Sequence, residues 1–171
     1  MPEDLDEKKP ILDKINRELR AIGSKLEDFS SLYHEKAECK ANPKAEWEGL
    51  LATAVAWGII PATESTFIMD DPGLGTDRCY SATYKVPPYG AFWSITIYDE
   101  NGFLFSNTNS IVNDHNVVMN KDGSFTVQYG SAEQCGDVPN RLDTTKGWNI
   151  IMRVYQANME KLATYSLPKI K

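Results

Sequence analysis

The sequence predicts an α+β protein, in which an N-terminal helical hairpin is followed by an antiparallel β-sandwich. Residues 1–48 contain 21 of the 42 charged residues, whereas 15 of the 18 aromatic residues follow position 49. The spacing of apolar residues also changes after Pro61, from the helical period to strict alternation. We therefore expect a helical appendage over residues 1–61 and a β-sandwich over residues 62–171.

The N-terminal part carries an apolar row typical of an amphipathic helix. Its members recur every three or four residues, and they are Ile15, Leu19, Ile22, Leu26, Phe29 and Tyr33. The helix is expected to end at Asn42, because the residue before a proline is disfavoured in the α conformation. A second helix is predicted over residues 44–58, and the two helices are expected to pack on the sandwich.

After Pro61 the pattern indicates short strands separated by turns. Strands are predicted over residues 66–69, 78–86, 91–98, 103–105, 117–119, 125–129 and 148–155, and loops over 107–116 and 135–146. In the clearest strand, Trp93, Ile95 and Ile97 are expected to face the interior. Glycine-containing turns at residues 99–102 and 120–123 are typical of hairpins. Since no helical pattern separates the strands, we expect an antiparallel sandwich.

Composition excludes several classes of function. The net charge of −6 argues against a nucleic-acid partner, and the longest apolar run is too short for a membrane span. No signal-peptide pattern opens the chain. The sequence has an odd number of cysteines, Cys39, Cys79 and Cys135, and no Cys-x-x-Cys pair. This pattern predicts reduced thiols and a cytoplasmic location.

The common catalytic and cofactor motifs are absent from the sequence, and we expect no cofactor and no metal. Of the two histidines, His34 is predicted to be solvated, and for His115 a turn-capping role is favoured over a general base. Asp99 and Asp122 could act as acid and base or bind Ca²⁺, but the same residues commonly stabilise turns.

Five side chains form the predicted ligand site. They lie on the sides of their strands opposite the expected core, and they are Thr96, Tyr98, Gln128, Arg153 and Tyr155. If these strands are neighbours, one sheet face combines hydroxyls, an amide, a guanidinium and aromatic rings. Such a face suits a neutral sugar or a small carboxylate. In the alternative interpretation, Arg153 forms an ion pair beneath the helices and the tyrosines pack there.

The segment Phe92-Trp93-Ser94-Ile95-Thr96-Ile97-Tyr98-Asp99 resembles the signature of the domain of unknown function 1214 family. Further features agree in order: Asn107, then residues 121–126, Arg153-Val154-Tyr155 and Leu167-Pro168. The resemblance implies a jelly-roll-like β-sandwich, and this chain looks like a stand-alone version without the usual partner, domain of unknown function 1254. The family carries no established reaction. A family Asn-Trp-Leu-Pro stretch appears here as Asn140-Arg141-Leu142-Asp143, and a basic residue usual after Asn107 is missing, which puts any ligand role of those positions in doubt.

Three functional hypotheses follow. The favoured one is a non-enzymatic module that binds a carbohydrate or another small polar ligand. The second is a carbohydrate-active hydrolase or lyase that uses loop carboxylates such as Asp99 and Asp122. The third is an assembly protein that forms a homodimer through residues 11–33.

Overall fold

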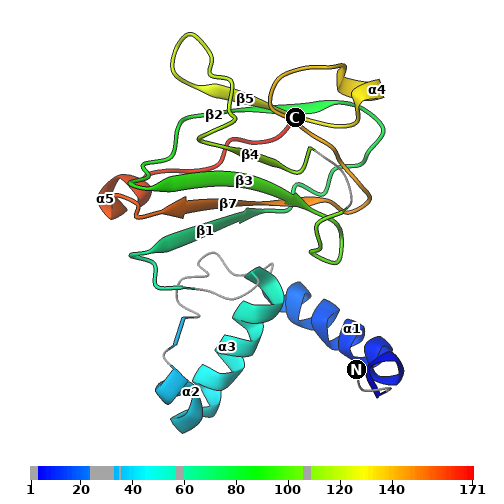
Figure 1. Cartoon of the computed structure of the whole chain (residues 1–171), viewed down its shortest axis with the longest axis vertical. Helices are drawn as coiled ribbons and strands as arrows, with labels where there is room; N and C mark the ends of the chain where they lie inside the picture. Colours follow the sequence, from blue (N-terminus) through cyan, green and yellow to red (C-terminus); the bar gives the residue numbers. More distant parts are fainter. Residues whose placement is uncertain (1–3, 24–32, 35, 57–59, 106–108) are drawn as a thin grey trace. The chain divides into compact units, whose positions relative to one another are not determined.

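The computed structural model describes residues 4–23, 33–34, 36–56, 60–105 and 109–171. The chain divides into two compact units, Met1–Pro61 and Ala62–Lys171 (Figure 1). The first unit is helical and the second contains all of the described strands, so the chain is an α+β protein. Among the described residues, no helix is both long enough and apolar enough to cross a membrane.

The first unit contains α1 (Asp4–Gly23), α2 (Lys36–Ala41) and α3 (Pro43–Ala56), and both α1 and α2 contact α3. The expected continuous helix up to Asn42 is not seen, because residues 33–34 are not helical and α2 is a separate short helix. Leu26 and Phe29 of the predicted row lie outside the described residues. Pro43 opens α3, a position where proline is favoured because the first helical N–H has no partner in the helix.

His34 is not solvated as predicted. Its Nε2 lies 2.6 Å from Glu48 Oε2, its Nδ1 lies 3.2 Å from Glu38 Oε2, and its side chain is 17% exposed. Hydrogen bonds to Glu48 and then Glu38 raise the pKa of His34 above its ordinary value. This histidine thus joins α2 to α3, which a charged helical pattern alone does not reveal.

The second unit is built from two sheets. Its strands are β1 (Ser65–Asp70), β2 (Tyr80–Tyr84), β3 (Phe92–Tyr98), β4 (Ile111–Asn113), β5 (Phe125–Tyr129), β6 (Arg141–Leu142) and β7 (Asn149–Tyr155). The first sheet has the order β1-β7-β3-β4 and is antiparallel throughout. The second has the order β2-β5-β6. Two short helices, α4 (Ala132–Cys135) and α5 (Met159–Leu162), follow β5 and β7.

Two predicted strands are wrong, and two strands occur in predicted loops. Residues 103–105 and 117–119 are not strands, whereas β4 and β6 lie where loops were expected. The Asn140 side chain explains part of this result, because its Oδ1 accepts the Val118 N–H and its Nδ2 donates to the Val118 carbonyl. These backbone groups are therefore unavailable to a strand. In addition, β6 runs parallel to β5. The long connection between the two strands makes this parallel pairing possible.

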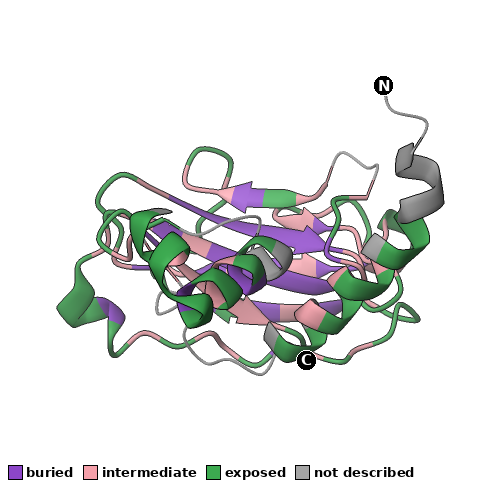
Figure 2. Cartoon of the chain, turned by 90° about the horizontal axis from the view of Figure 1, so that it is seen from below, coloured by how far each residue is buried: buried purple, intermediate pink, exposed green. Residues whose placement is uncertain are grey.

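Aromatic side chains fill the space between the two sheets. Trp93 of β3 stacks on Phe125 of β5 with ring centres 4.7 Å apart, and Phe125 stacks on Tyr84 at 5.3 Å. Tyr129 stacks on Trp148 at 5.1 Å. The predicted inward positions of β3 and β7 are buried, and Figure 2 shows the buried residues concentrated along the strands. Alternation after Pro61 thus places the core as expected.

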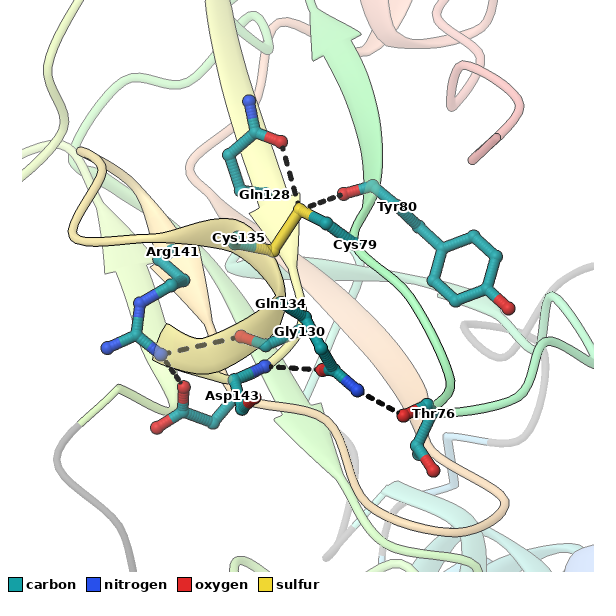
Figure 3. Close-up of a disulfide and its surroundings, with 10 residues drawn as sticks. Thr76, Cys79, Tyr80, Gln128, Gly130, Gln134, Cys135, Arg141 and Asp143 are labelled. Atoms are coloured by element: carbon teal, nitrogen blue, oxygen red, sulfur yellow. Dashed lines mark hydrogen bonds and ion pairs between the residues drawn. A yellow bond between two sulfur atoms is a disulfide. The ribbon is translucent and has the colours of Figure 1, made fainter.

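Cys79 and Cys135 form a disulfide, contrary to the predicted reduced thiols, and Cys39 is free (Figure 3). Cys79 precedes β2 and Cys135 ends α4, so the pairing of Tyr80 with Tyr129 brings the two cysteines together. Gly130 permits this approach, because a Cβ there would lie 2.8 Å from Cys135 Sγ. Gln134 fixes the short helix, since its Oε1 accepts the Ser131 N–H at 2.8 Å and its amide donates to the Thr76 carbonyl.

We predict that reducing this disulfide lowers the free energy of unfolding by about 2–4 kcal/mol, because the bond closes a long loop in the unfolded chain. Urea unfolding with and without reductant measures the difference. The Cys79→Ala/Cys135→Ala variant should behave like the reduced protein, and Cys39→Ala like the wild type. Three free thiols in the native protein, or equal midpoints in both conditions, would contradict the prediction.

Candidate functional site

Four of the five predicted site residues lie on one face of the first sheet. In the β3–β7 pair, Phe92 is opposite Tyr155, Ser94 opposite Arg153, and Thr96 opposite Ile151. Opposite residues of an antiparallel pair share a face. Thr96, Tyr98, Arg153 and Tyr155 therefore lie on the side away from the second sheet, as expected.

Gln128 does not join them, and its predicted placement on this face is wrong. It belongs to β5 of the other sheet, where it is opposite Ser81, and its Oε1 lies 3.6 Å from Cys79 Sγ. The prediction required β5 to neighbour β3 or β7. Which strands pair is a long-range property that local alternation does not determine.

Arg153 is held by aromatic contacts rather than by an acid. Its Nη2 donates to the Tyr98 hydroxyl at 2.7 Å, and its guanidinium carbon lies 5.4 Å from the Phe67 ring centre and 5.5 Å from that of Tyr98. Within the described part of the chain, Arg153 forms no ion pair, so the alternative ion-paired arrangement is not seen there. Thr96 and Tyr98 are only 6% and 5% exposed. Their role in ligand binding stays a prediction.

A hollow of about 600 Å³ lies elsewhere in the sandwich, between β1 and the C-terminal segment. We call it the β1 groove. Its lining consists of Ile68, Met69, Asp70, Pro72, Leu74 and residues 165–170. β1 is an edge strand of the first sheet, so its outer edge is free to form one wall.

Local sequence explains the first wall. Ile68 is opposite Met152 and Asp70 is opposite Ile150, and both partners are fully buried. Alternation along β1 therefore turns Ile68 and Asp70 toward the second sheet. The strand ends in a turn at Gly73, which has a φ of 61° and donates its N–H to Asp71 Oδ1.

The C-terminal segment forms the second wall and is fixed at both ends. The Tyr165 hydroxyl donates to the Lys85 carbonyl at 2.9 Å, and burial raises the pKa of Tyr165 to about 12, so this donor keeps its proton at neutral pH. Near the other end, the backbones of Lys171 and Ser81 exchange two hydrogen bonds of 2.8 and 3.1 Å. Figure 1 shows the segment, in red, running back toward β2. The groove is thus preformed.

Asp70 is the distinctive group in the groove. It is partly buried and forms no hydrogen bond or ion pair through its carboxylate with the residues that the structure describes. Burial raises its pKa above the ordinary value, and the charge of Asp71 raises it further. The Tyr84 and Tyr129 hydroxyls are 2.5 Å apart and share one hydrogen bond, in which either can be the donor. A perturbed carboxylate in a hollow is a typical sign of a functional site.

Comparison with known proteins supplies the family. The model of a family described as "Protein of unknown function (DUF1214)" matches residues 69–159, more than half of the chain. The chain belongs to the DUF1214 family. Proteins with curated descriptions give no match.

Two solved structures are similar to this DUF1214 chain. The VPA0106 protein from Vibrio parahaemolyticus is 26% identical with a TM-score of 0.63, and the match covers 100% of this chain and 45% of that one. An uncharacterised protein from Burkholderia cenocepacia is 20% identical with a TM-score of 0.52, and the match covers 71% of this chain and 32% of that one. The chain therefore spans less than half the length of either relative.

The departure from the DUF1214 pattern at residues 140–143 has a structural account. Arg141 forms an ion pair with Asp143, so the two unusual residues satisfy each other. Arg141 and the neighbouring Asn140 line a polar hollow of about 210 Å³. The Asn140 amide is already bonded to the backbone at Val118 and Thr126, so Asn140 is engaged in holding the fold there.

The remaining candidates for acid–base chemistry are engaged in turns. Asp99 Oδ1 accepts the N–H groups of Asn101 and Phe103, and Asp122 Oδ1 accepts the N–H and hydroxyl of Ser124. The His115 side chain is 79% exposed. No group of three or more His, Cys, Asp or Glu suited to a metal ion occurs among the described residues.

The predicted strand ends at residue 69, and Asp70 is not among the predicted site residues. A signal was present, because continuing the alternation of Thr66 and Ile68 by one step places Asp70 on the inward side. A charged residue at an inward position is unusual enough to suggest a function. No comparable signal locates the C-terminal wall.

We predict that Asp70→Asn stabilises the protein at pH 7. The fold raises the pKa of Asp70 above 3.8, so folding favours the protonated carboxyl, and stability is lost as the pH rises through this raised pKa. The gain from Asp70→Asn should therefore shrink as the pH falls through that pKa. Thermal unfolding at several pH values tests this, with Asp71→Asn as the control. A variant less stable than the wild type at pH 7 would contradict it.

Proposed function

We propose that the DUF1214 sandwich is a non-enzymatic binding module that holds a small molecule with an apolar body in the β1 groove. The observation that carries this proposal is the groove itself, a hollow of about 600 Å³ between two anchored walls. Small-molecule sites commonly have volumes of about 300–1,000 Å³ and are largely preformed. Both criteria fit this groove.

The lining supports an apolar ligand body over a carbohydrate. Ile68, Leu74 and Leu167 line the groove and pack against the hydrophobic core, so a ligand there would extend the core. The predicted carbohydrate site loses its Gln128 member, and in the polar hollow the Asn140 amide is already bonded to the backbone. For the hydrolase or lyase alternative, Asp99 and Asp122 are the predicted groups, and each already stabilises its own turn.

Assembly through the first helix is a second candidate function, favoured by an exposed apolar row. Ile11, Ile15 and Ile22 of α1 are 61%, 46% and 46% exposed, and their spacing places them on one side of the helix. We predict that a second copy of the chain covers this row. Sedimentation of the full chain should show a dimer that Ile15→Glu dissociates, and a monomer at high concentration would contradict it.

The disulfide bears on the proposed location. The cytoplasmic prediction depended on reduced cysteines, whereas disulfides persist mainly in oxidising compartments, so Cys79–Cys135 supports such a compartment instead. The jelly-roll form of the sandwich, the packing of the helices on it and the stand-alone state stay predictions.

The groove predicts a specific binding result. A neutral probe, 2-phenylethanol, should shift amide NMR signals in the segments 68–74 and 165–170, which contain the lining residues of the groove. Leu167→Gln should weaken binding at least about fivefold, because the ligand loses an apolar contact. Leu104→Gln is the matched control, since Leu104 is 59% exposed in a loop and does not line the groove. Shifts elsewhere, or unchanged binding to Leu167→Gln, would contradict the proposal.

A further inference from the structure

The β1 groove combines its apolar lining with a carboxylate that the sandwich leaves unpaired. Building on the proposed function, we propose that the groove selects an organic ammonium ion with an apolar body, and that Asp70 binds its charge. The inference depends on the position of Asp70, on the charges and donors around it, and on the apolar side chains beside it.

The first step is the position of Asp70. It is the last residue of β1, it faces inward opposite Ile150, and it lines the groove. A carboxylate can accept about four hydrogen bonds, and leaving one partly buried without a partner costs free energy. Among the described residues nothing satisfies this carboxylate. A ligand that carries several N–H donors would do so.

The second step is that none of the neighbouring described side chains donates to the Asp70 carboxylate. The Tyr165 hydroxyl donates to the Lys85 carbonyl, and the Tyr84 and Tyr129 hydroxyls share one hydrogen bond, in which one donates to the other. Lys169 also lines the groove, but it is exposed and forms no ion pair with Asp70. None of these groups neutralises the carboxylate in the described structure.

The third step is the sign of the charge. Asp71 follows Asp70 in the chain and adds a second negative charge, which raises the pKa of Asp70 together with burial. An anionic ligand would be repelled by both carboxylates. A neutral alcohol can donate only one hydrogen bond, whereas an ammonium ion supplies three donors and an opposite charge.

The fourth step is the body of the ligand. Ile68, Leu74 and Leu167 provide the apolar contacts, so a small inorganic cation or a highly polar polyamine would leave them unused. The two requirements together define an amphipathic amine, such as an arylalkyl or alkyl ammonium ion.

A matched series of probes with one phenylethyl body tests the proposal on the full chain. The probes are 2-phenylethylammonium, 2-phenylethanol and 3-phenylpropanoate, each titrated at pH 7 with NMR detection of residues 68–74 and 165–170. We expect the ammonium ion to bind about tenfold more tightly than the alcohol, as charged hydrogen bonds exceed neutral ones. The third probe, 3-phenylpropanoate, should bind most weakly.

Two variants separate the charge effect from the shape effect. Asp70→Asn keeps the size of the side chain and should bring the ammonium ion and the alcohol to within about twofold of each other. Asp71→Asn is the matched control. It should retain most of the preference for the ammonium ion over the alcohol, because Asp71 is exposed and does not line the groove. Lowering the pH through the pKa of Asp70 should reproduce the Asp70→Asn result, while Tyr165, Tyr84 and Tyr129, whose pKa values burial raises, keep their protons.

The outcomes distinguish this inference from the proposed function. Equal binding of ammonium and alcohol to the wild type, or a preference that survives Asp70→Asn, overturns the role of Asp70 but leaves a groove that binds apolar molecules. If 3-phenylpropanoate binds most tightly of the three probes, the role of Asp70 is overturned in favour of Lys169. Absence of binding by all three probes overturns the inference and the proposed function together.

Discussion

The stack of Trp93 on Phe125 is the contact on which the arrangement of the sandwich depends. It joins β3 of the first sheet to β5 of the second, and Phe125 continues the stack to Tyr84 on β2. Such rings bury large apolar areas and prefer defined separations. The stack therefore sets the distance between the sheets, and every residue on an inward position is placed relative to it.

The β1 groove is a consequence of that spacing at the edge of the sandwich. β1 and β2 are edge strands of different sheets, and within the described ranges no strand closes the gap between them. The C-terminal segment covers this side, held by Tyr165 and by the backbone pairing of Lys171 with Ser81. A bound segment packs less completely than a paired strand, so space remains beside Ile68 and Asp70.

The sequence predicted the features that depend on near neighbours. Alternation located β1, β2, β3, β5 and β7 and identified Trp93 and Trp148 as core residues, because a half-buried strand imposes a period of two. Alternation did not locate β4 and β6, because these strands have only three and two residues. It also failed for Gln128 and for the Cys79–Cys135 bond, because strand pairing and a separation of 56 residues are set by the whole fold.

The disulfide encloses most of the sandwich within a single covalent ring. Residues between Cys79 and Cys135 include β2, β3, β4 and β5, whereas β1, β6 and β7 lie outside. A force applied across residues 62–171 would therefore stretch only the segments before and after the ring. At about 3.6 Å per residue, the sequence separation of 56 between the cysteines withholds roughly 200 Å of extension. Mechanical pulling would thus strip β1 from β7 and β7 from β3 while the enclosed strands stay tethered.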